Sequence, residues 1–296
     1  ASELRADRIS GKDRYETAVK VSQQGWESAE TVVLARGDQY ADALAGVPLA
    51  HLYGGPLLLS KTSSLPASTY DEIKRLGAKQ VYVLGGETAI SKEVLAKLTQ
   101  SGIKVERISG KDRYETAAKI ASKFGKYDTA VIASGSNFPD ALSVSSYAAE
   151  QGMPILLTRD KSLPAVTKDA LVKAGVDQTY VIGGKVAVND SVLKAVPNGH
   201  RISGSSRYAT SVAISEFFAD DTKRVYVSTG VNFADALAGG VLAAKEGSGV
   251  YIVGKNVTPE LGEHLQTLGV EYVDVLGGKV AVPDSILAEL DKYLGN

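Results

Sequence analysis

One motif returns three times along this chain at nearly equal spacing. It reads RISGKDRY at residues 8–15, RISGKDRY at 107–114 and RISGSSRY at 201–208, and we call it the signature. Each signature is followed by a loop that ends in Asp-Ala-Leu, and then by an apolar segment that runs into two glycines. Because the order of these three motifs never changes, the chain consists of three copies of one unit.

Each copy has about a hundred residues, a length that can bury a core of its own. We therefore expect three compact modules, at residues 1–106, 107–200 and 201–296. The strand expected at 104–108 leads directly into the next signature, so no linker separates the copies and the modules should pack against one another. Three equal modules on short connections favour a ring with approximate threefold symmetry, although a linear row is compatible with the same sequence.

Strand and helix patterns alternate within each copy. In the first copy we expect strands at 4–9, 31–35, 57–59, 81–84 and 104–108, and helices after Asp13, at 42–52, after Pro66 and after the N-cap candidate Ser91. The nearly continuous apolar run at 31–35 is typical of a parallel strand covered on both faces. The predicted fold class is α/β, with parallel-sheet modules that carry helices on both faces.

Composition excludes several classes of function. The formal net charge is -1, so the chain has no overall positive electrostatic field that would favour nucleic acid or an anionic membrane as a partner. The chain has no cysteine, which excludes disulfides, thiol catalysis and cysteine-ligated metals. No apolar run reaches the roughly 18 residues of a membrane span, and the first residues do not read as a signal peptide, so we expect the chain to begin after such a segment has been removed.

The charged candidates for binding are the second arginine of each signature and the aspartate of each Asp-Ala-Leu loop: Arg14, Arg113, Arg207, Asp42, Asp140 and Asp235. Both are expected where loops leave strands or enter helices, the rim on which open α/β sheets bind ligands. Arginine offers a bidentate donor to phosphate, pyruvyl or carboxylate groups, and aspartate accepts from sugar hydroxyls. The alternative is an ion pair within one module that fixes two loops. The first arginines, Arg8, Arg107 and Arg201, are expected at strand ends, where they could pair across module boundaries, and a structural role is favoured.

Aromatic residues and glycine pairs also recur at matching positions. Tyr40, Phe138 and Phe233 precede the loop aspartates, where an exposed ring could stack on a sugar and a buried one would pack beneath the loop. The glycine pairs are Gly85 and Gly86, Gly183 and Gly184, and Gly277 and Gly278. They bring backbone N–H groups toward a helix start, which indicates either a weak anion site or tight packing between strand and helix.

No catalytic set of residues is recognisable. His51, His200 and His264 occupy unrelated positions of the three copies, so they predict no shared metal site. The chain contains no HExxH, no GxSxG and no P-loop, and neither a cofactor nor a metal ion is expected.

Taken together, RISGKDRYETA, the aromatic-x-DAL loop, the PLLL or PILL strand and the LGG or IGG turn resemble the cell wall binding repeat 2 family of Gram-positive surface proteins and autolysins. The motifs cover nearly the whole chain. The resemblance implies three Toprim-like or Rossmann-like modules around a pseudo-threefold axis. It also implies a secreted location in the cell wall and noncovalent binding of an anionic secondary wall polymer, teichoic-acid-like or another charged polysaccharide. Attached domains of such proteins carry the enzymatic or adhesive function.

The leading hypothesis is therefore a monomeric, non-catalytic anchor in which three weak sites act together on a repeating polymer. One alternative is an enzyme that acts on phosphorylated or nucleotide-linked sugars through the loop aspartates. Another is a structural spacer of a surface layer. The third copy departs from the pattern with Ser205 and Ser206 in place of Lys-Asp, and it has no proline before Val250. We therefore expect the three copies to bind unequally.

Overall fold

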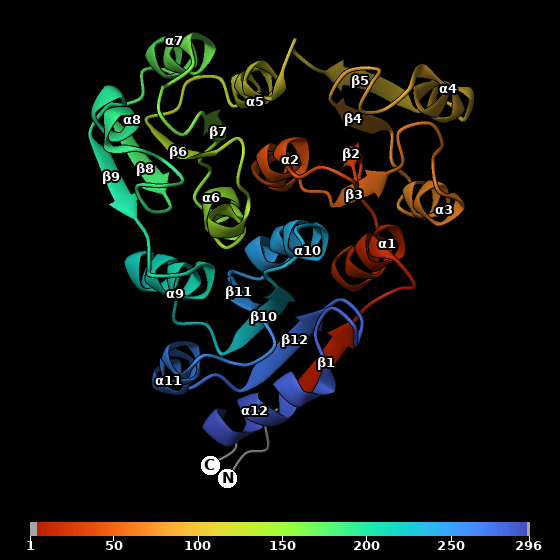
Figure 1. Ribbon diagram of the computed structural model, residues 1–296. Helices are drawn as coiled ribbons and strands as arrows, with labels where there is room; N and C mark the ends of the chain where they lie inside the picture. The colour runs from red at the N-terminus through yellow and green to blue at the C-terminus, as the bar shows by residue number, and fades with distance from the viewer. Residues whose placement is uncertain (1–4, 295–296) are drawn as a thin grey trace.

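The computed structural model describes residues 5–294, which form three modules of alternating strands and helices (Figure 1). The first module contains α1 (Arg14–Gly25), β2 (Thr31–Arg36), α2 (Ala41–Leu52), β3 (Leu57–Ser60), α3 (Ala67–Arg75), β4 (Gln80–Leu84), α4 (Lys92–Gln100) and β5 (Lys104–Ile108). The second contains α5 (Arg113–Ser122), β6 (Thr129–Ser134), the short 3-10 helix η1 (Pro139–Ala141), α6 (Val144–Glu150), β7 (Ile155–Thr158), α7 (Ala165–Ala174), β8 (Gln178–Ile182), α8 (Asp190–Ala195) and β9 (Gly199–Ile202). The third contains α9 (Arg207–Phe217), β10 (Arg224–Thr229), α10 (Ala234–Lys245), β11 (Val250–Val253), α11 (Pro259–Leu268), β12 (Tyr272–Leu276) and α12 (Asp284–Leu294), together with β1 (Arg5–Ile9).

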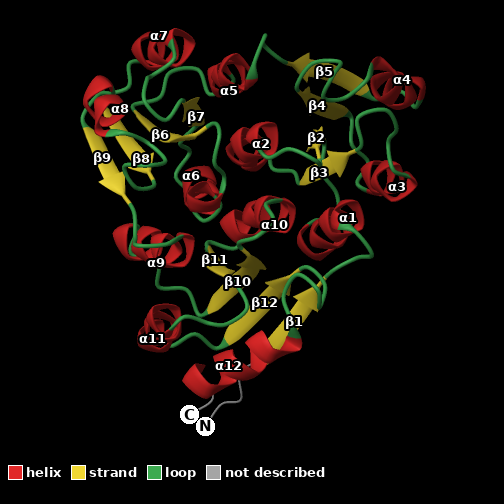
Figure 2. Ribbon diagram, in the orientation of Figure 1, coloured by secondary structure: helices red, strands yellow, loops and turns green. Residues whose placement is uncertain are grey.

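Each module is built on one parallel sheet of four strands. The orders are β3-β2-β4-β5, β7-β6-β8-β9 and β11-β10-β12-β1. The middle strands β2, β6 and β10 are buried over nearly their whole length, as the continuous apolar runs predict. Inner helices α2, α6 and α10 cover one face of the sheets, and the outer helices α3, α4, α7, α8, α11 and α12 cover the other (Figure 2). The predicted α/β modules with helices on both faces are confirmed.

The strand at the start of the first repeat belongs to the sheet of the third repeat. β1 pairs with β12 in parallel register, from Arg5 opposite Tyr272 to Ile9 opposite Leu276. β1 thus takes in the third sheet the edge position that β5 and β9 hold in the first and second sheets. The predicted strand began at Leu4, which lies outside the described residues. This pairing joins the two ends of the described chain and closes the three modules into a ring.

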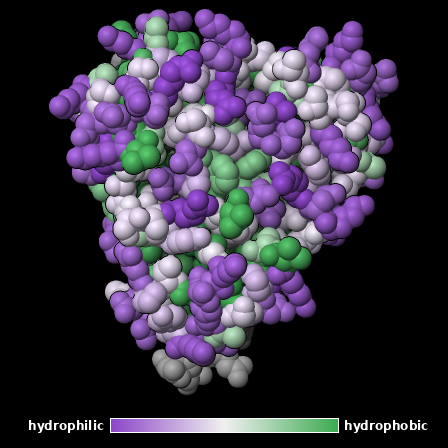
Figure 3. Space-filling view, viewed as in Figure 1, coloured by the Kyte–Doolittle hydropathy of each residue, from purple (hydrophilic) through white to green (hydrophobic). Residues whose placement is uncertain are grey.

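The inner helices meet at the centre of this ring, as Figure 1 shows for α2, α6 and α10. All three are buried along almost their whole length and carry small residues where they approach. A Cβ on Gly240 of α10 would lie 2.9 Å from Ser145 Oγ of α6, so these helices pack in close contact. In the view of Figure 3, hydrophobic residues gather mainly where the modules meet, and hydrophilic residues cover most of the periphery. The predicted pseudo-threefold ring is confirmed.

The signature forms a helix start. Asp13, Asp112 and Ser206 are the N-caps of α1, α5 and α9, and each side chain accepts a hydrogen bond from a backbone N–H three residues later. The serine of the third signature therefore keeps the capping role of the aspartate that it replaces. Ser91 stands at the N-cap of α4 as predicted, but its hydroxyl makes no capping hydrogen bond.

The proline missing from the third repeat has a packing explanation. Gly249 stands where the other repeats have proline, and a Cβ on Gly249 would lie 2.1 Å from Tyr147 Oη of the second module. Tyr147 stacks on Phe218 and donates a hydrogen bond to Asp220 Oδ2 at 2.6 Å. Only glycine leaves room for this tyrosine at the contact between the second and third modules.

Candidate functional site

Each sheet has a switch point, from which two neighbouring strands send the chain to opposite sides. In the first sheet, the chain leaves β2 toward β3 on one side, and it leaves β4 toward β5 on the other. The carboxyl ends of these two neighbouring strands carry the Asp-Ala-Leu loop and the glycine pair. Open α/β sheets bind ligands at such a point. The same arrangement recurs in the other two sheets.

The loop aspartate and the first glycine of the pair touch at this point. Gly85 has a positive φ of 94°, and a Cβ there would lie 2.7 Å from Asp42 Oδ2. The corresponding distances are 2.9 Å between Gly183 and Asp140 and 2.5 Å between Gly277 and Asp235. Only glycine combines this backbone conformation with this close contact. This close contact explains why both the glycine and the aspartate recur in all three repeats.

The two glycines of each pair differ in what their N–H groups can offer to an anion. The N–H of the first glycine donates to the last residue of the neighbouring edge strand, from Gly85 to Ile108, from Gly183 to Ile202 and from Gly277 to Ile9. The first glycines therefore have no N–H left for a ligand. The second glycines, Gly86, Gly184 and Gly278, have open space where a Cβ would stand, so a ligand can approach their backbone.

The first arginine of each signature holds the glycine turn in place. Arg8, Arg107 and Arg201 donate to the carbonyls of Gly277, Gly85 and Gly183, each at 2.7 Å. Arg8 and Arg201 also form ion pairs with Asp284 and Asp190, whereas Nη2 of Arg107 is buried without a hydrogen-bond partner. The structural role expected for these arginines agrees with these contacts.

The second arginine of each signature bridges two repeats. Nη1 of Arg14 donates to the carbonyl of Gly37 in its own repeat, and its charge acts on Asp235 of the third repeat. Arg113 likewise bonds Gly135 and acts on Asp42, and Arg207 bonds Gly230 and acts on Asp140. Among residues 5–294 no ion pair joins these arginines to the loop aspartates. The alternative prediction of an ion pair within one module is therefore wrong, because each arginine faces the aspartate of the preceding repeat around the ring.

Burial makes the three aspartates weaker acids than an aspartate in water. Removal from water raises the pKa of Asp42 and of Asp140 above the ordinary value, and it raises the pKa of Asp235 to about 6. The nearby arginines oppose this rise without cancelling it. Each site therefore holds a partly dehydrated carboxyl group beside a guanidinium of the next repeat.

The three aromatic residues meet one another at the centre of the ring. Ring centroids of Tyr40, Phe138 and Phe233 lie 5.5, 5.7 and 6.3 Å apart. Tyr40 and Phe233 are buried and Phe138 is half-buried. Arg113 lies over the ring of Tyr40 and Arg14 over that of Phe233. The rings thus pack between modules and position the arginines, and Tyr40 and Phe233 leave little surface on which a sugar could stack.

The signature of one repeat and the switch point of the preceding repeat together line a crevice. The first–second crevice is a cavity of about 170 Å³ between the loop and turn of the first repeat and the second signature, lined by Arg36, Asp42, Gly85, Gly86, Lys111 and Arg113 among others. The third–first crevice is a cavity of about 620 Å³ between the third repeat and the first signature, lined by Lys12, Arg14, Asp235, Lys255, Gly278 and Lys279 among others. The predicted site residues did not include Arg36, Lys12, Lys255 or Lys279, because none of these four recurs in all three repeats.

The departure in the third signature consequently affects the junction between the second and third repeats. Arg207 of that signature faces Asp140, so Ser205 and Ser206 lie beside the switch point of the second repeat. The switch point of the third repeat is completed instead by the intact first signature, through Lys12 and Arg14. One feature of the sequence indicated this arrangement, since the strand expected at 104–108 leads directly into the next signature and leaves no linker between the repeats.

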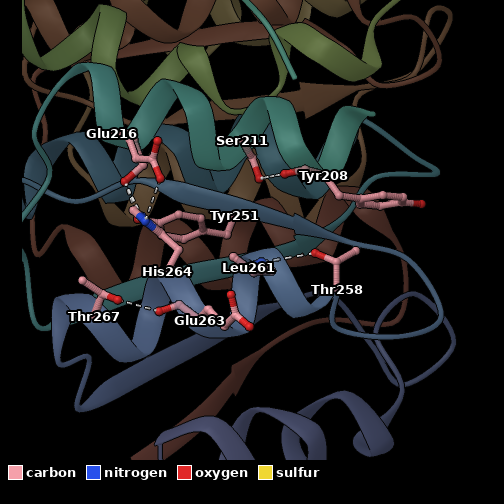
Figure 4. Close-up of polar contacts among 10 residues, drawn as sticks. Tyr208, Ser211, Glu216, Tyr251, Thr258, Leu261, Glu263, His264 and Thr267 are labelled. Carbon is pink, nitrogen blue, oxygen red and sulfur yellow. Dashed lines mark hydrogen bonds and ion pairs between the residues drawn. The ribbon is translucent and has the colours of Figure 1, made fainter. Parts of the chain in front are cut away.

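A further polar cluster lies inside the third module (Figure 4). His264 of α11 contacts Ser215 Oγ at 3.0 Å and Tyr251 Oη at 3.2 Å through Nε2, and Glu216 at 3.8 Å through Nδ1. Burial lowers the pKa of His264, and Ser215 is 1% exposed. A substrate cannot reach this serine, so the cluster stabilises the packing of α9 on α11.

The described chain offers few other sites for chemistry. No group of three or more His, Cys, Asp or Glu side chains within residues 5–294 is arranged to hold a metal ion. Over the same residues, no helix has the length and apolar character required to cross a membrane.

Comparison with known proteins gives consistent results. The family model described as Cell wall binding domain 2 (CWB2) matches residues 8–95, 107–193 and 201–287. The chain is 34% identical over 284 residues to N-acetylmuramoyl-L-alanine amidase LytC of Bacillus subtilis, covering 96% of this chain and 57% of that protein. It is also 34% identical over 294 residues to the Amidase enhancer of Bacillus subtilis, covering 98% of this chain and 40% of that protein.

The fold is shared with a solved structure. Cwp6 from Clostridium difficile superposes with a TM-score of 0.89 at 28% identity, covering 99% of this chain and 48% of Cwp6. The chain thus spans about half the length of the proteins that it matches.

Proposed function

Because this chain belongs to the Cell wall binding domain 2 family, we propose that it is a non-catalytic module that anchors an attached protein to the wall of a Gram-positive bacterium. The ligand is an anionic secondary wall polymer, teichoic-acid-like or another charged polysaccharide, held without a covalent bond. Association with the cell wall follows from the family, and the choice of polymer is argued from the crevices.

One observation carries the proposal. An arginine of each repeat lies beside the buried aspartate and the open glycine turn of the preceding repeat, and this arrangement recurs around the ring. Guanidinium groups suit phosphate and carboxylate groups, which they bind through two parallel N–H donors. A carboxyl group beside them accepts from sugar hydroxyls. A charged saccharide offers both kinds of group in every repeating unit.

Three sites on one rigid body suit a long polymer. Once one unit of the polymer is bound, binding of the next unit is intramolecular, so weak sites combine into strong attachment. The close packing of α2, α6 and α10 keeps the crevices at fixed distances from one another. We expect the chain to act as a monomer outside the cell, with its attached region free to do enzymatic or adhesive work.

Sedimentation with isolated walls tests the proposal. Walls of the producing bacterium are used before and after acid extraction of their secondary polymers. We expect the purified chain to sediment with untreated walls and to stay in solution with extracted walls. Equal binding to both preparations would refute polymer binding. Self-association without wall binding would instead support a structural spacer.

A further inference from the structure

The two cavities between repeats differ in size although the motifs that form them are alike. The third–first crevice has a volume of about 620 Å³ and the first–second crevice about 170 Å³. Pockets that enclose small organic ligands measure about 300–1,000 Å³. The larger cavity thus has room for a sugar ring with its charged group, and the smaller one has room only for a small anion.

Two substitutions account for the difference, one at the last residue of the middle strand and one in the loop that follows it. In the first repeat, Arg36 extends along the crevice and forms a bidentate pair with Asp38, at 2.6 Å from Nε and 3.0 Å from Nη2. The third repeat has Thr229 and Val231 at the same two positions. The short side chain of Thr229 is buried, so nothing comparable to the Arg36 guanidinium occupies the third–first crevice.

The larger crevice is also the more basic one. Lys12, Arg14, Lys255 and Lys279 line it together with the carboxylates of Asp13 and Asp235. The carboxylate of Asp13 caps α1, just as that of Asp112 caps α5, and Lys279 forms an ion pair with Asp284 at 3.2 Å. In the smaller crevice Arg36, Lys111 and Arg113 face Asp42 and Asp112, and the charge of Arg36 is neutralised by Asp38. Lys12 and Lys255 of the larger crevice are exposed, so they can adjust to the phosphate or carboxylate groups of a flexible chain.

We propose that, of these two crevices, the third–first one contributes more to polymer binding and accommodates a whole charged sugar unit, whereas the first–second crevice receives only a single anionic group. The inference rests on the proposed function and adds a ranking of its sites. It also gives the pairing of β1 with β12 a role in binding, because this pairing brings the first signature to the third repeat.

Exchanging the two loop positions tests the inference. Thr229→Arg with Val231→Asp should fill the third–first crevice and weaken binding to isolated walls by at least about tenfold. Arg36→Thr with Asp38→Val should open the first–second crevice and strengthen binding by about two- to threefold. A melting temperature close to that of the unchanged chain shows that each variant folds.

Single lysine variants provide a test that does not depend on refilling a cavity. Lys12→Ala should weaken wall binding by about fivefold, and the matched change Lys111→Ala by about twofold or less. Lys79→Ala removes an exposed charge at the amino end of β4, the opposite edge of the sheet, and should have no effect.

Three outcomes are distinguishable. Equal losses for Lys12→Ala and Lys111→Ala, or wall binding that survives the filled third–first crevice, would overturn the ranking and leave the proposed function intact. If the unchanged chain fails to distinguish walls with polymer from extracted walls, the proposed function itself fails.

Discussion

The ionisation of Asp235 should lower the stability of the folded chain at neutral pH. Burial raises its pKa from 3.8 to about 6, so between these values the folded state binds more protons than the unfolded state. Stability therefore rises as the pH falls through about 6. A rise of one unit in pKa corresponds to about 1.4 kcal/mol. At pH 7.5 the ionised carboxylate therefore lowers the free energy of unfolding by about 3 kcal/mol.

Asp235→Asn removes this ionisation at nearly unchanged size. The variant should be more stable than the unchanged chain by about 3 kcal/mol at pH 7.5, which corresponds to a melting temperature about 5 °C higher. The gain should shrink to less than about 1 kcal/mol at pH 4, where the unchanged chain is protonated in the folded state.

Thermal unfolding followed by circular dichroism at pH 7.5 and pH 4 measures both values. Asp42→Asn serves as a comparison, since burial also raises the pKa of Asp42 and the gain should have the same sign. A variant of Asp235 that is less stable at pH 7.5, or a gain of equal size at both pH values, would refute the reasoning. Loss of wall binding alongside the gain would show that the carboxylate is kept for binding at the expense of stability.

Other predictions concern packing and charge. Lys92→Asp should stabilise the chain by about 1 kcal/mol in chemical denaturation. Lys92 stands where the other repeats have Asp190 and Asp284, so an aspartate there gives Arg107 the ion-pair partner that Arg201 and Arg8 already have. An unchanged denaturation midpoint would contradict this. Gly249→Ala should destabilise by about 1–3 kcal/mol, and adding Tyr147→Leu should recover part of the loss; if the second change makes no difference to the melting temperature, the two residues do not collide. Wall binding should tighten from pH 7.5 to 5.5 as Asp235 is neutralised among Lys12, Asp13, Arg14, Lys255 and Lys279, and binding that weakens would argue that the carboxylate must be ionised. Affinity should fall between low and high salt, since charge attraction is screened, and salt-independent binding would exclude an anionic ligand.

The α/β fold class and most of its strands and helices could be predicted from the sequence. Continuous apolar runs such as the one at β2 predicted buried parallel strands, and the short connections predicted modules in contact. These features depend on local periodicity and on burial within about a hundred residues, which a sequence displays directly.

The pairing between repeats was harder to predict. The sequence around Arg14 does not show whether this arginine faces Asp42 or Asp235, because its partner depends on which sheet β1 joins. That pairing joins residues at opposite ends of the chain, and no local pattern records it. The meeting of Tyr40, Phe138 and Phe233 has the same origin, since it requires the three loops to converge on one axis.

A crystal structure of the chain with an oligosaccharide released by acid extraction of the wall would test the central claim most directly. The account predicts a sugar unit in the third–first crevice, with its anionic group within hydrogen-bonding distance of Arg14 and a hydroxyl group donating to Asp235. An oligosaccharide bound to the outer helices, with the crevices between repeats empty, would contradict it.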